Sequence, residues 1–373
     1  MQSAAEELDL RFSDEQDMLI EVADEFAREW SGFEAMRALV DSADGFNPDA
    51  WRAMVGLGWP ATLIPEQFGG SGLTVSELVP VAEALGRRLM ASPLVPTVLA
   101  TLAIRAGSDA QQAAWLPSLA QGGIGTIALR EPGREWLMAE PALEATETSD
   151  GFRLTGQKTD VAFAAAADLI IVSARLRGTP RLFLVERSCF SGDALRPQPA
   201  LDQTQRVANL AFDGLLLPDT ALLAGESGGV DQLARAATLL SAAEMCGGAA
   251  GCIELTLDYL KMRHAFGRPI GAFQALKHPM ADMFAHKEMA RSLLYGASSQ
   301  WPTDKGWQLA RMASAKLADL FPHIADRAIQ FHGGIGFTYE CNAAPFLRRA
   351  IWLRAQYGDG PFFRRSLADE LLA

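Results

Sequence analysis

Cysteine and histidine are scarce in this sequence and are not spaced to bind a metal. The chain has four cysteines and five histidines among 373 residues. The cysteines (Cys189, Cys246, Cys252 and Cys341) form no CxxC pair and have no histidine at ligand spacing. We therefore expect buried free thiols in a reducing cytoplasm, and no metal site.

The sequence also lacks long apolar runs and an excess of positive charge. Runs such as residues 215–217 are too short to cross a bilayer, and the N-terminus has neither the basic nor the apolar region of a signal peptide. Lys and Arg number 33 against 45 Asp and Glu, a formal charge of -12 that repels nucleic acid and anionic lipid. We expect a cytoplasmic protein that binds neither nucleic acid nor membrane.

Two common enzyme signatures are missing as well. Ser241 and Ser314 are not set in a nucleophile elbow, which argues against a hydrolase. No strand precedes the glycine-rich segments, which argues against a Rossmann dinucleotide site. The chemistry must therefore be sought in other motifs.

The pattern of the chain changes twice along its length. Residues 1–122 have helical spacing, beginning with a capping box formed by Ser13 and Gln16. Residues 123–226 contain short β-prone runs separated by Gly, Pro and Asp, which predict a small β-barrel. Residues 227–373 return to long helices, including a proline-free stretch whose glycines favour close helix packing. This order predicts an α+β multidomain fold with an N-terminal helical domain, a middle β-barrel and a C-terminal four-helix bundle.

Two glycine-containing segments each follow a predicted helix. Residues 263–274 read RHAFGRPIGAFQ, in which Arg263 and Arg268 flank a glycine turn and can bind a diphosphate bidentately. Residues 330–337 read QFHGGIGF, in which the glycines permit close backbone approach to a ligand and Gln330 can pair with a heteroaromatic edge.

Together and in this order, the two segments resemble those of the acyl-CoA dehydrogenase family. The segment PEQFGGSG at residues 65–72 is similar to the family's N-terminal domain, and Glu131-Pro132-Gly133 and Gly156-Gln157-Lys158 resemble fragments of its middle domain. The resemblance covers nearly the whole chain.

The resemblance implies an FAD that lies across a subunit interface. Arg263 and Phe266 look like residues on the diphosphate side, and Gln330, Gly333 and Gly334 look like the adenosine side. The implied reaction is Cα–Cβ oxidation of an acyl-CoA, in which a carboxylate removes the α-proton and the flavin accepts the β-hydride. An electron-transfer flavoprotein or a similar acceptor would reoxidise the flavin.

The catalytic carboxylate of the family is displaced in this sequence. Many members carry a glutamate before a glycine at the position of Tyr357, and a branch carries it near Ala237; neither residue is an acid here. Glu244 lies two helical turns beyond Ala237 on the same face, in a small-residue stretch where an unpaired carboxylate is costly. We predict Glu244 or Asp359 as the catalytic base, although an arginine pair across the subunit interface for Glu244 and a helix cap for Asp359 are open alternatives. Glu254 is expected on a solvated face.

The residues expected to face the flavin ring are also altered. Arg130 stands at the family's threonine position, and Trp136 at its serine position. This asymmetry suits a heterotetramer of unlike subunits with half the usual number of FADs, as in steroid-degrading relatives. The alternative is a homotetramer whose flavin pocket uses different residues. We therefore expect a homo- or hetero-tetramer with a related subunit.

The predicted function is an FAD-dependent acyl-CoA dehydrogenase, or a subunit of one, for a bulky or steroid side-chain acyl-CoA. The alternatives are a non-catalytic subunit that completes a partner's FAD site and a flavin oxidase or monooxygenase on the same fold. The segment from Asp202 to Arg206 resembles a structural segment of the family. The arginines of one C-terminal helix (Arg348, Arg349 and Arg354) are expected on a solvated face.

Overall fold

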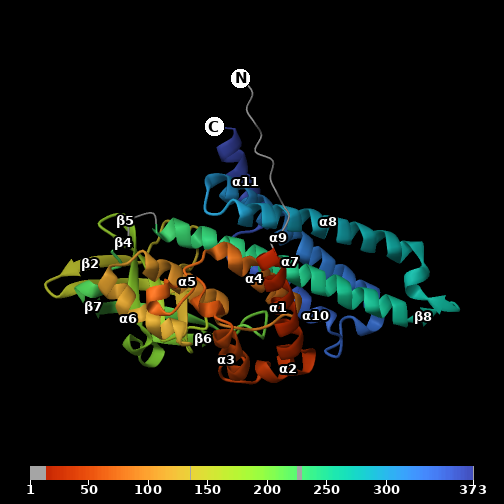
Figure 1. The fold of residues 1–373 in the computed structure, drawn as a ribbon, viewed down its shortest axis with the longest axis horizontal. Helices are drawn as coiled ribbons and strands as arrows, with labels where there is room; N and C mark the ends of the chain where they lie inside the picture. The colour runs from red at the N-terminus through yellow and green to blue at the C-terminus, as the bar shows by residue number, and fades with distance from the viewer. Residues whose placement is uncertain (1–13, 135, 225–228, 373) are drawn as a thin grey trace.

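The computed structural model describes residues 14–134, 136–224 and 229–372, and its elements form three groups in chain order (Figure 1). Helices come first, then a β-sheet, then long helices. The molecule is elongated: the sheet lies at one end, and the long C-terminal helices run to the other (Figure 1). The helix, strand, helix order predicted from the sequence is confirmed.

The N-terminal group is helical throughout. Its α-helices are α1 (Asp14–Trp30), α2 (Phe33–Val40), α3 (Pro48–Gly56), α4 (Val79–Arg87), α5 (Leu94–Arg105) and α6 (Asp109–Ala120). The start of α3 shows why the sequence folds this way: the Asn47 side chain accepts a 2.9 Å hydrogen bond from the backbone N–H of Asp49, and Pro48 occupies the first turn. The capping box predicted at Ser13 and Gln16 lies outside the described residues.

The middle group forms one seven-stranded sheet. Its strands are β1 (Gly125–Ala128), β2 (Glu144–Thr148), β3 (Gly151–Ala162), β4 (Leu169–Leu176), β5 (Thr179–Glu186), β6 (Leu195–Gln198) and β7 (Val207–Leu217). The order is β1-β4-β2-β3-β7-β6, and β5 pairs with β4. Because no pairing between β6 and β1 closes the ring within the described residues, the predicted barrel is a curled sheet.

The C-terminal group contains the longest helices of the described chain. They are α7 (Gly229–Met262), α8 (Gln274–Ser299), α9 (Asp304–His332), α10 (Ala343–Arg354) and α11 (Gly360–Leu371). Among the described residues, α7 alone is long and apolar enough to cross a membrane, but 94% of that stretch is buried inside the protein. It is the central helix of the core.

The backbones of α4 and α7 approach each other unusually closely. A Cβ added to Gly247 would lie 1.8 Å from the carbonyl oxygen of Glu83, and one added to Gly251 would lie 2.0 Å from that of Arg87. Only glycine leaves room for this contact. The prediction that the glycines of this helix serve close packing is confirmed, and the contact fixes α7 against the N-terminal helices.

Candidate functional site

The first glycine segment forms a short hairpin at the end of α7. Strands β8 (His264–Ala265) and β9 (Arg268–Pro269) pair, and the turn residues Phe266 and Gly267 have φ angles of 52° and 77°. Two consecutive positive φ angles are typical of a two-residue hairpin turn. The Phe266 side chain is 91% exposed, and the Arg268 guanidinium lies 4.1 Å from the centre of the Phe273 ring. The hairpin thus presents aromatic and cationic groups to the exterior.

The second glycine segment ends α9. Gly333 has a φ of 65°, and added Cβ atoms at Gly333 and Gly334 would meet nothing within 4 Å. Their backbone is therefore open to a ligand, and Gln330 is exposed on the last turn of the helix. The adenosine-side role of this segment stays a prediction.

Tyr259 joins the two segments. Its hydroxyl donates a 3.1 Å hydrogen bond to the His332 carbonyl, and the two rings stack with centroids 4.2 Å apart. Arg263 follows Tyr259 by one turn, and its backbone N–H donates to the Tyr259 carbonyl at 2.9 Å. Sequence reasoning missed Tyr259, although an aromatic residue one turn before the motif was visible.

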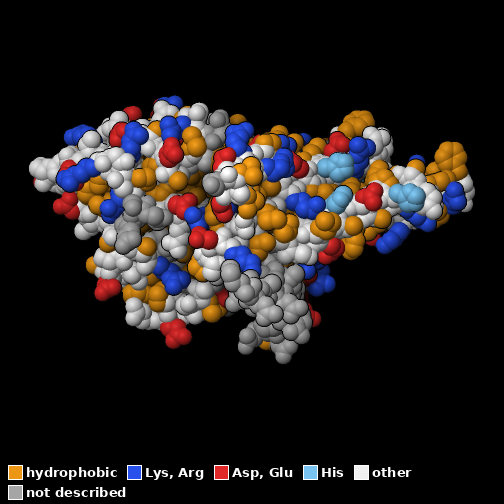
Figure 2. Space-filling model, turned by 90° about the horizontal axis from the view of Figure 1, so that it is seen from above, with side chains coloured by type: hydrophobic (Ala, Val, Ile, Leu, Met, Phe, Trp, Pro, Cys, Tyr) orange, Lys and Arg blue, Asp and Glu red, His pale blue; other side chains and the backbone are white. Residues whose placement is uncertain are grey.

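The tip of the long helices exposes an apolar surface. Met262, Phe266 and Phe284 are 72%, 91% and 51% exposed. Figure 2 shows hydrophobic, basic and histidine side chains together at this end of the molecule. Exposed apolar side chains clustered in this way mark a surface that another molecule covers.

The hairpin and the sheet lie at opposite ends of the chain (Figure 1). The hairpin expected to bind the diphosphate and the sheet of the middle group are therefore separated in a single copy of this chain (Figure 1).

At the sheet end, Arg130 connects the middle and C-terminal groups. Its Nη1 lies 2.9 Å from Oδ2 of Asp160 and donates a 3.3 Å hydrogen bond to Oε1 of Gln356. Asp160 has a φ of 52° and lies where the pairing of β3 with β7 shifts register. This bulge turns the Asp160 side chain away from the regular ladder. Nothing in the sequence pattern indicated it.

Trp136 makes a second connection across the same boundary. Its Nε1 donates a 3.1 Å hydrogen bond to the Ala355 carbonyl, and its ring centroid lies 5.5 Å from that of Phe362. The two residues that replace the family's expected ring contacts therefore both reach the segment around Tyr357.

Glu244 and Tyr357 lie within electrostatic range of each other, and Tyr357 lies within range of Arg130. Burial raises the pKa of Glu244 to about 7, Arg349 opposes that rise and Asp202 adds to it. Burial, and then the nearby Glu244, raise the pKa of Tyr357 to about 12, against the effect of Arg130. Within the described residues the Glu244 side chain makes no hydrogen bond or ion pair, and its pairing with an arginine across a subunit interface stays a prediction. We call Glu244, Tyr357 and Arg130 the Glu244 cluster.

Asp359 has a structural role. Its side chain accepts a 2.8 Å hydrogen bond from the backbone N–H of Phe362 and caps α11, as the capping alternative predicts. Arg354 lies 3.9 Å away. Glu254 is about half exposed and lies 3.7 Å from Arg87, which fits the expected solvated face.

The expectation for Arg349 was wrong. Arg349 is not on a solvated face: it is 2% exposed and forms a buried ion pair with Asp202. It also donates a 2.8 Å hydrogen bond to the hydroxyl of Thr204. Burial of the charge is tolerated because Asp202 comes from the loop before β7, 147 residues away, and such a partner is invisible in local sequence.

Glu131 and Lys158, which belong to the two middle-domain fragments, form a buried ion pair. The Lys158 ammonium donates to Glu131 at 2.7 Å and to the Ser173 hydroxyl at 2.9 Å, and its side chain is fully buried. Desolvation lowers the pKa of Lys158 to about 8 although Glu131 opposes that change. This pair holds the 131–143 loop onto the sheet.

The cysteines show no ligand cluster. Cys246, Cys252 and Cys341 are buried free thiols, whereas Cys189 is exposed, so the expectation of a buried thiol was wrong for Cys189. No group of three metal-ligating side chains occurs in the described part of the chain.

Comparison with known proteins identifies the fold family. The model of the acyl-CoA dehydrogenase N-terminal domain matches residues 13–123, and that of the C-terminal domain matches residues 233–372. Acyl-CoA dehydrogenase IpdE2 of Mycolicibacterium smegmatis is 30% identical over 340 residues, which cover 91% of this chain and 93% of the relative. IpdE2 of Mycobacterium tuberculosis is 31% identical, with 90% and 91% covered.

This chain belongs to the acyl-CoA dehydrogenase family.

Solved structures agree with this assignment. The ChsE4-ChsE5 complex from Mycobacterium tuberculosis is similar with a TM-score of 0.90 at 26% identity, covering 98% of this chain and 99% of that one. A variant of the Tcur3481-Tcur3483 steroid ACAD has a TM-score of 0.87 at 28% identity, covering 96% and 98%. The protein is an oxidoreductase of the CH–CH donor class.

Proposed function

We propose that this acyl-CoA dehydrogenase oxidises the Cα–Cβ bond of a bulky acyl-CoA, such as one with a steroid-derived acyl group, in the cytoplasm. The similarity to a steroid enzyme at 28% identity over nearly the whole chain supports this substrate class. The electron acceptor would be an electron-transfer flavoprotein or a similar protein.

Separate sets of residues would bind the diphosphate–adenosine half and the ring half of FAD. The exposed hairpin with Arg263 and Phe266 would bind the diphosphate, and Gln330, Gly333 and Gly334 would bind the adenosine. The bound flavin supplies the hydride acceptor. At the sheet end of this chain, beside the Glu244 cluster, Arg130 and Trp136 would contact the ring of a flavin whose diphosphate and adenosine a neighbouring subunit binds in the same way.

The neighbour would be another acyl-CoA dehydrogenase chain. The opposite positions of the hairpin and the sheet support a shared flavin site (Figure 1). The similarity to a complex of two different chains, ChsE4 and ChsE5, favours a related but different subunit over a second copy, and a tetramer of such chains is the expected assembly.

Glu244 would remove the α-proton. Its carboxylate is unpaired within the described residues, and its raised pKa of about 7 suits a base at neutral pH. Tyr357 stays neutral because its pKa is raised to about 12, so it cannot replace the missing glutamate. The arrangement of the Glu244 cluster is the observation that best supports Glu244 as the catalytic base. Asp359 remains a weaker candidate because it caps α11.

Anaerobic titration of the flavin-loaded enzyme with a steroid side-chain acyl-CoA tests this function. We expect bleaching of the flavin absorbance by the acyl-CoA and slow reoxidation in air, as befits a dehydrogenase. Absence of bleaching with every acyl-CoA, or fast reoxidation with peroxide release, would contradict it. Co-purification with a related subunit tests the assembly, and a homotetramer with one FAD per chain would overturn the unlike partner.

A further inference from the structure

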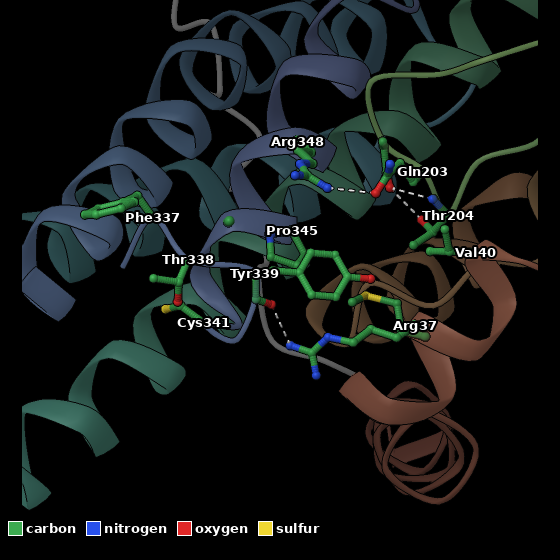
Figure 3. A pocket seen from close by; sticks show the side chains of 13 residues that line it. Arg37, Val40, Gln203, Thr204, Phe337, Thr338, Tyr339, Cys341, Pro345 and Arg348 are labelled. Atoms are coloured by element: carbon green, nitrogen blue, oxygen red, sulfur yellow. Dashed lines mark hydrogen bonds between the residues drawn. The ribbon is translucent and has the colours of Figure 1, made fainter. Parts of the chain in front are cut away.

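A pocket lies where all three parts of the chain meet. It has a volume of about 240 Å³ and is lined by α2, by the loop at residues 202–204 and by residues 337–348 (Figure 3). No step of the proposed dehydrogenation uses it. It is separate from the Glu244 cluster, from the hairpin and from the glycines at the end of α9, none of which line it.

The charge of this pocket is positive, although the chain is strongly acidic overall. Arg37 and Arg348 line it. The acid in its lining, Asp202, is already neutralised by its buried ion pair with Arg349. An anion entering the pocket would therefore meet two guanidinium groups and no free carboxylate from the lining.

Both guanidinium groups have N–H groups that are not used in hydrogen bonds to other described residues. Arg37 uses only Nη2, which donates to the Asn342 side chain at 2.7 Å and to the carbonyls of Tyr339 and Glu340 at 3.3 and 3.4 Å. Arg348 uses only Nη1, which donates to Oε1 of Gln203 at 2.8 Å. Within the described residues the other N–H groups of both side chains have no partner. The remaining N–H groups of Arg348 are therefore available to hydrogen-bond a phosphoryl group.

An exposed aromatic ring also lines this pocket. Tyr339 is 65% exposed, and the Arg37 guanidinium lies 5.6 Å from the centre of its ring. Figure 3 shows the Tyr339 ring beside Pro345, between Arg37 and Arg348. An exposed aromatic ring next to cations is the combination that binds a planar base by stacking and its phosphate by charge.

We propose that this pocket binds a nucleoside monophosphate, with the phosphate at Arg348 and the base against Tyr339. The volume of about 240 Å³ lies below the roughly 300–1,000 Å³ of pockets for drug-sized molecules, which argues against a ligand as large as FAD. The bound nucleotide would bridge the N-terminal, middle and C-terminal parts of the chain.

Calorimetric titration of the assembled, FAD-saturated enzyme with AMP tests this site, because saturating FAD blocks the adenosine side of the flavin site. We expect one AMP per chain of this sequence, with adenosine and inorganic phosphate each binding at least about tenfold more weakly. Arg348→Gln should raise the Kd for AMP about tenfold or more, since hydrogen bonds to charged groups contribute about 1.5–3 kcal/mol. Tyr339→Leu should weaken AMP and adenosine but leave phosphate unchanged.

Arg153→Gln, an exposed arginine on β3, is the matched control and should leave the Kd unchanged. Phosphate that binds as tightly as AMP would mean an adventitious ion only and would overturn the proposal. Loss of AMP binding in Arg263→Gln, with Arg348→Gln unaffected, would place AMP in the flavin site and would also overturn it. That last result would leave the proposed dehydrogenase function intact, so the two proposals fail separately.

Discussion

The Tyr259 hydroxyl donates a 3.1 Å hydrogen bond to the carbonyl of His332, and the two rings stack. This one contact ties the end of α7 to the end of α9 and so holds the Arg263 hairpin in a fixed position relative to Gly333 and Gly334. Neither glycine segment alone is a strong signature. Joined by this contact, they would form the diphosphate and adenosine sides of the proposed flavin site.

Tyr259→Ala should therefore weaken FAD retention without touching any expected FAD contact. We expect the Kd for FAD to rise about tenfold, because both the hydrogen bond and the stacking are lost. Tyr259→Phe keeps the stacking and should raise the Kd by only about threefold. Fluorescence titration of the apoprotein with FAD measures both. Equal effects of the two variants would show that stacking contributes nothing.

Gly247→Ala should destabilise the fold strongly. The new Cβ would lie 1.8 Å from the carbonyl oxygen of Glu83, so α4 and α7 must separate. We expect a loss of about 2–4 kcal/mol in the free energy of unfolding, measured by urea denaturation. Gly56→Ala is the matched control, because a Cβ there meets nothing within 4 Å, and it should change stability by less than about 1 kcal/mol. Similar losses in both variants would disprove the close helix contact.

The raised pKa of Glu244 predicts how stability depends on pH. Its pKa is about 7 in the folded protein against an ordinary 4.5, so between these values the unfolded chain is ionised while the folded protein still holds the proton. Stability from this group is thus present at low pH and is lost as pH rises toward 7. Glu244→Gln has no carboxyl group to ionise, so the variant does not lose stability as pH rises through this range. Relative to the parent, the variant should gain on the order of 2 kcal/mol between about pH 5.5 and pH 8. A difference that is independent of pH would mean that the carboxylate is not desolvated.

An element could be predicted from the sequence where residues within that element mark it. The long helix α7 was marked by a proline-free stretch, and the turn of the hairpin was marked by a glycine between two arginines. Strand β2 was missed because its residues, Glu144–Thr148, are mostly polar and only Ala145 is buried. Its place in the sheet comes from pairing with β3 and β4, which the strand itself does not reveal.

The site was harder to predict because its key relationships join distant parts of the chain. The partner of Arg349 lies 147 residues away, and the partner of Arg130 depends on a bulge in β3. Motif positions placed Tyr357 and Glu244 on different elements. Only the packing of α7 against the segment after α10 brings them within electrostatic range.

Glu244→Gln tests the central claim most directly. The variant, purified with any subunit that accompanies the parent, should keep its FAD content and lose turnover of acyl-CoA by at least about a hundredfold. Glu254→Gln, a more exposed acid on the same helix, should retain activity. In the parent, kcat/KM should rise with pH up to about 7 and then level off, because the ionised carboxylate is the active form. Unchanged turnover in Glu244→Gln at full FAD content would contradict the account.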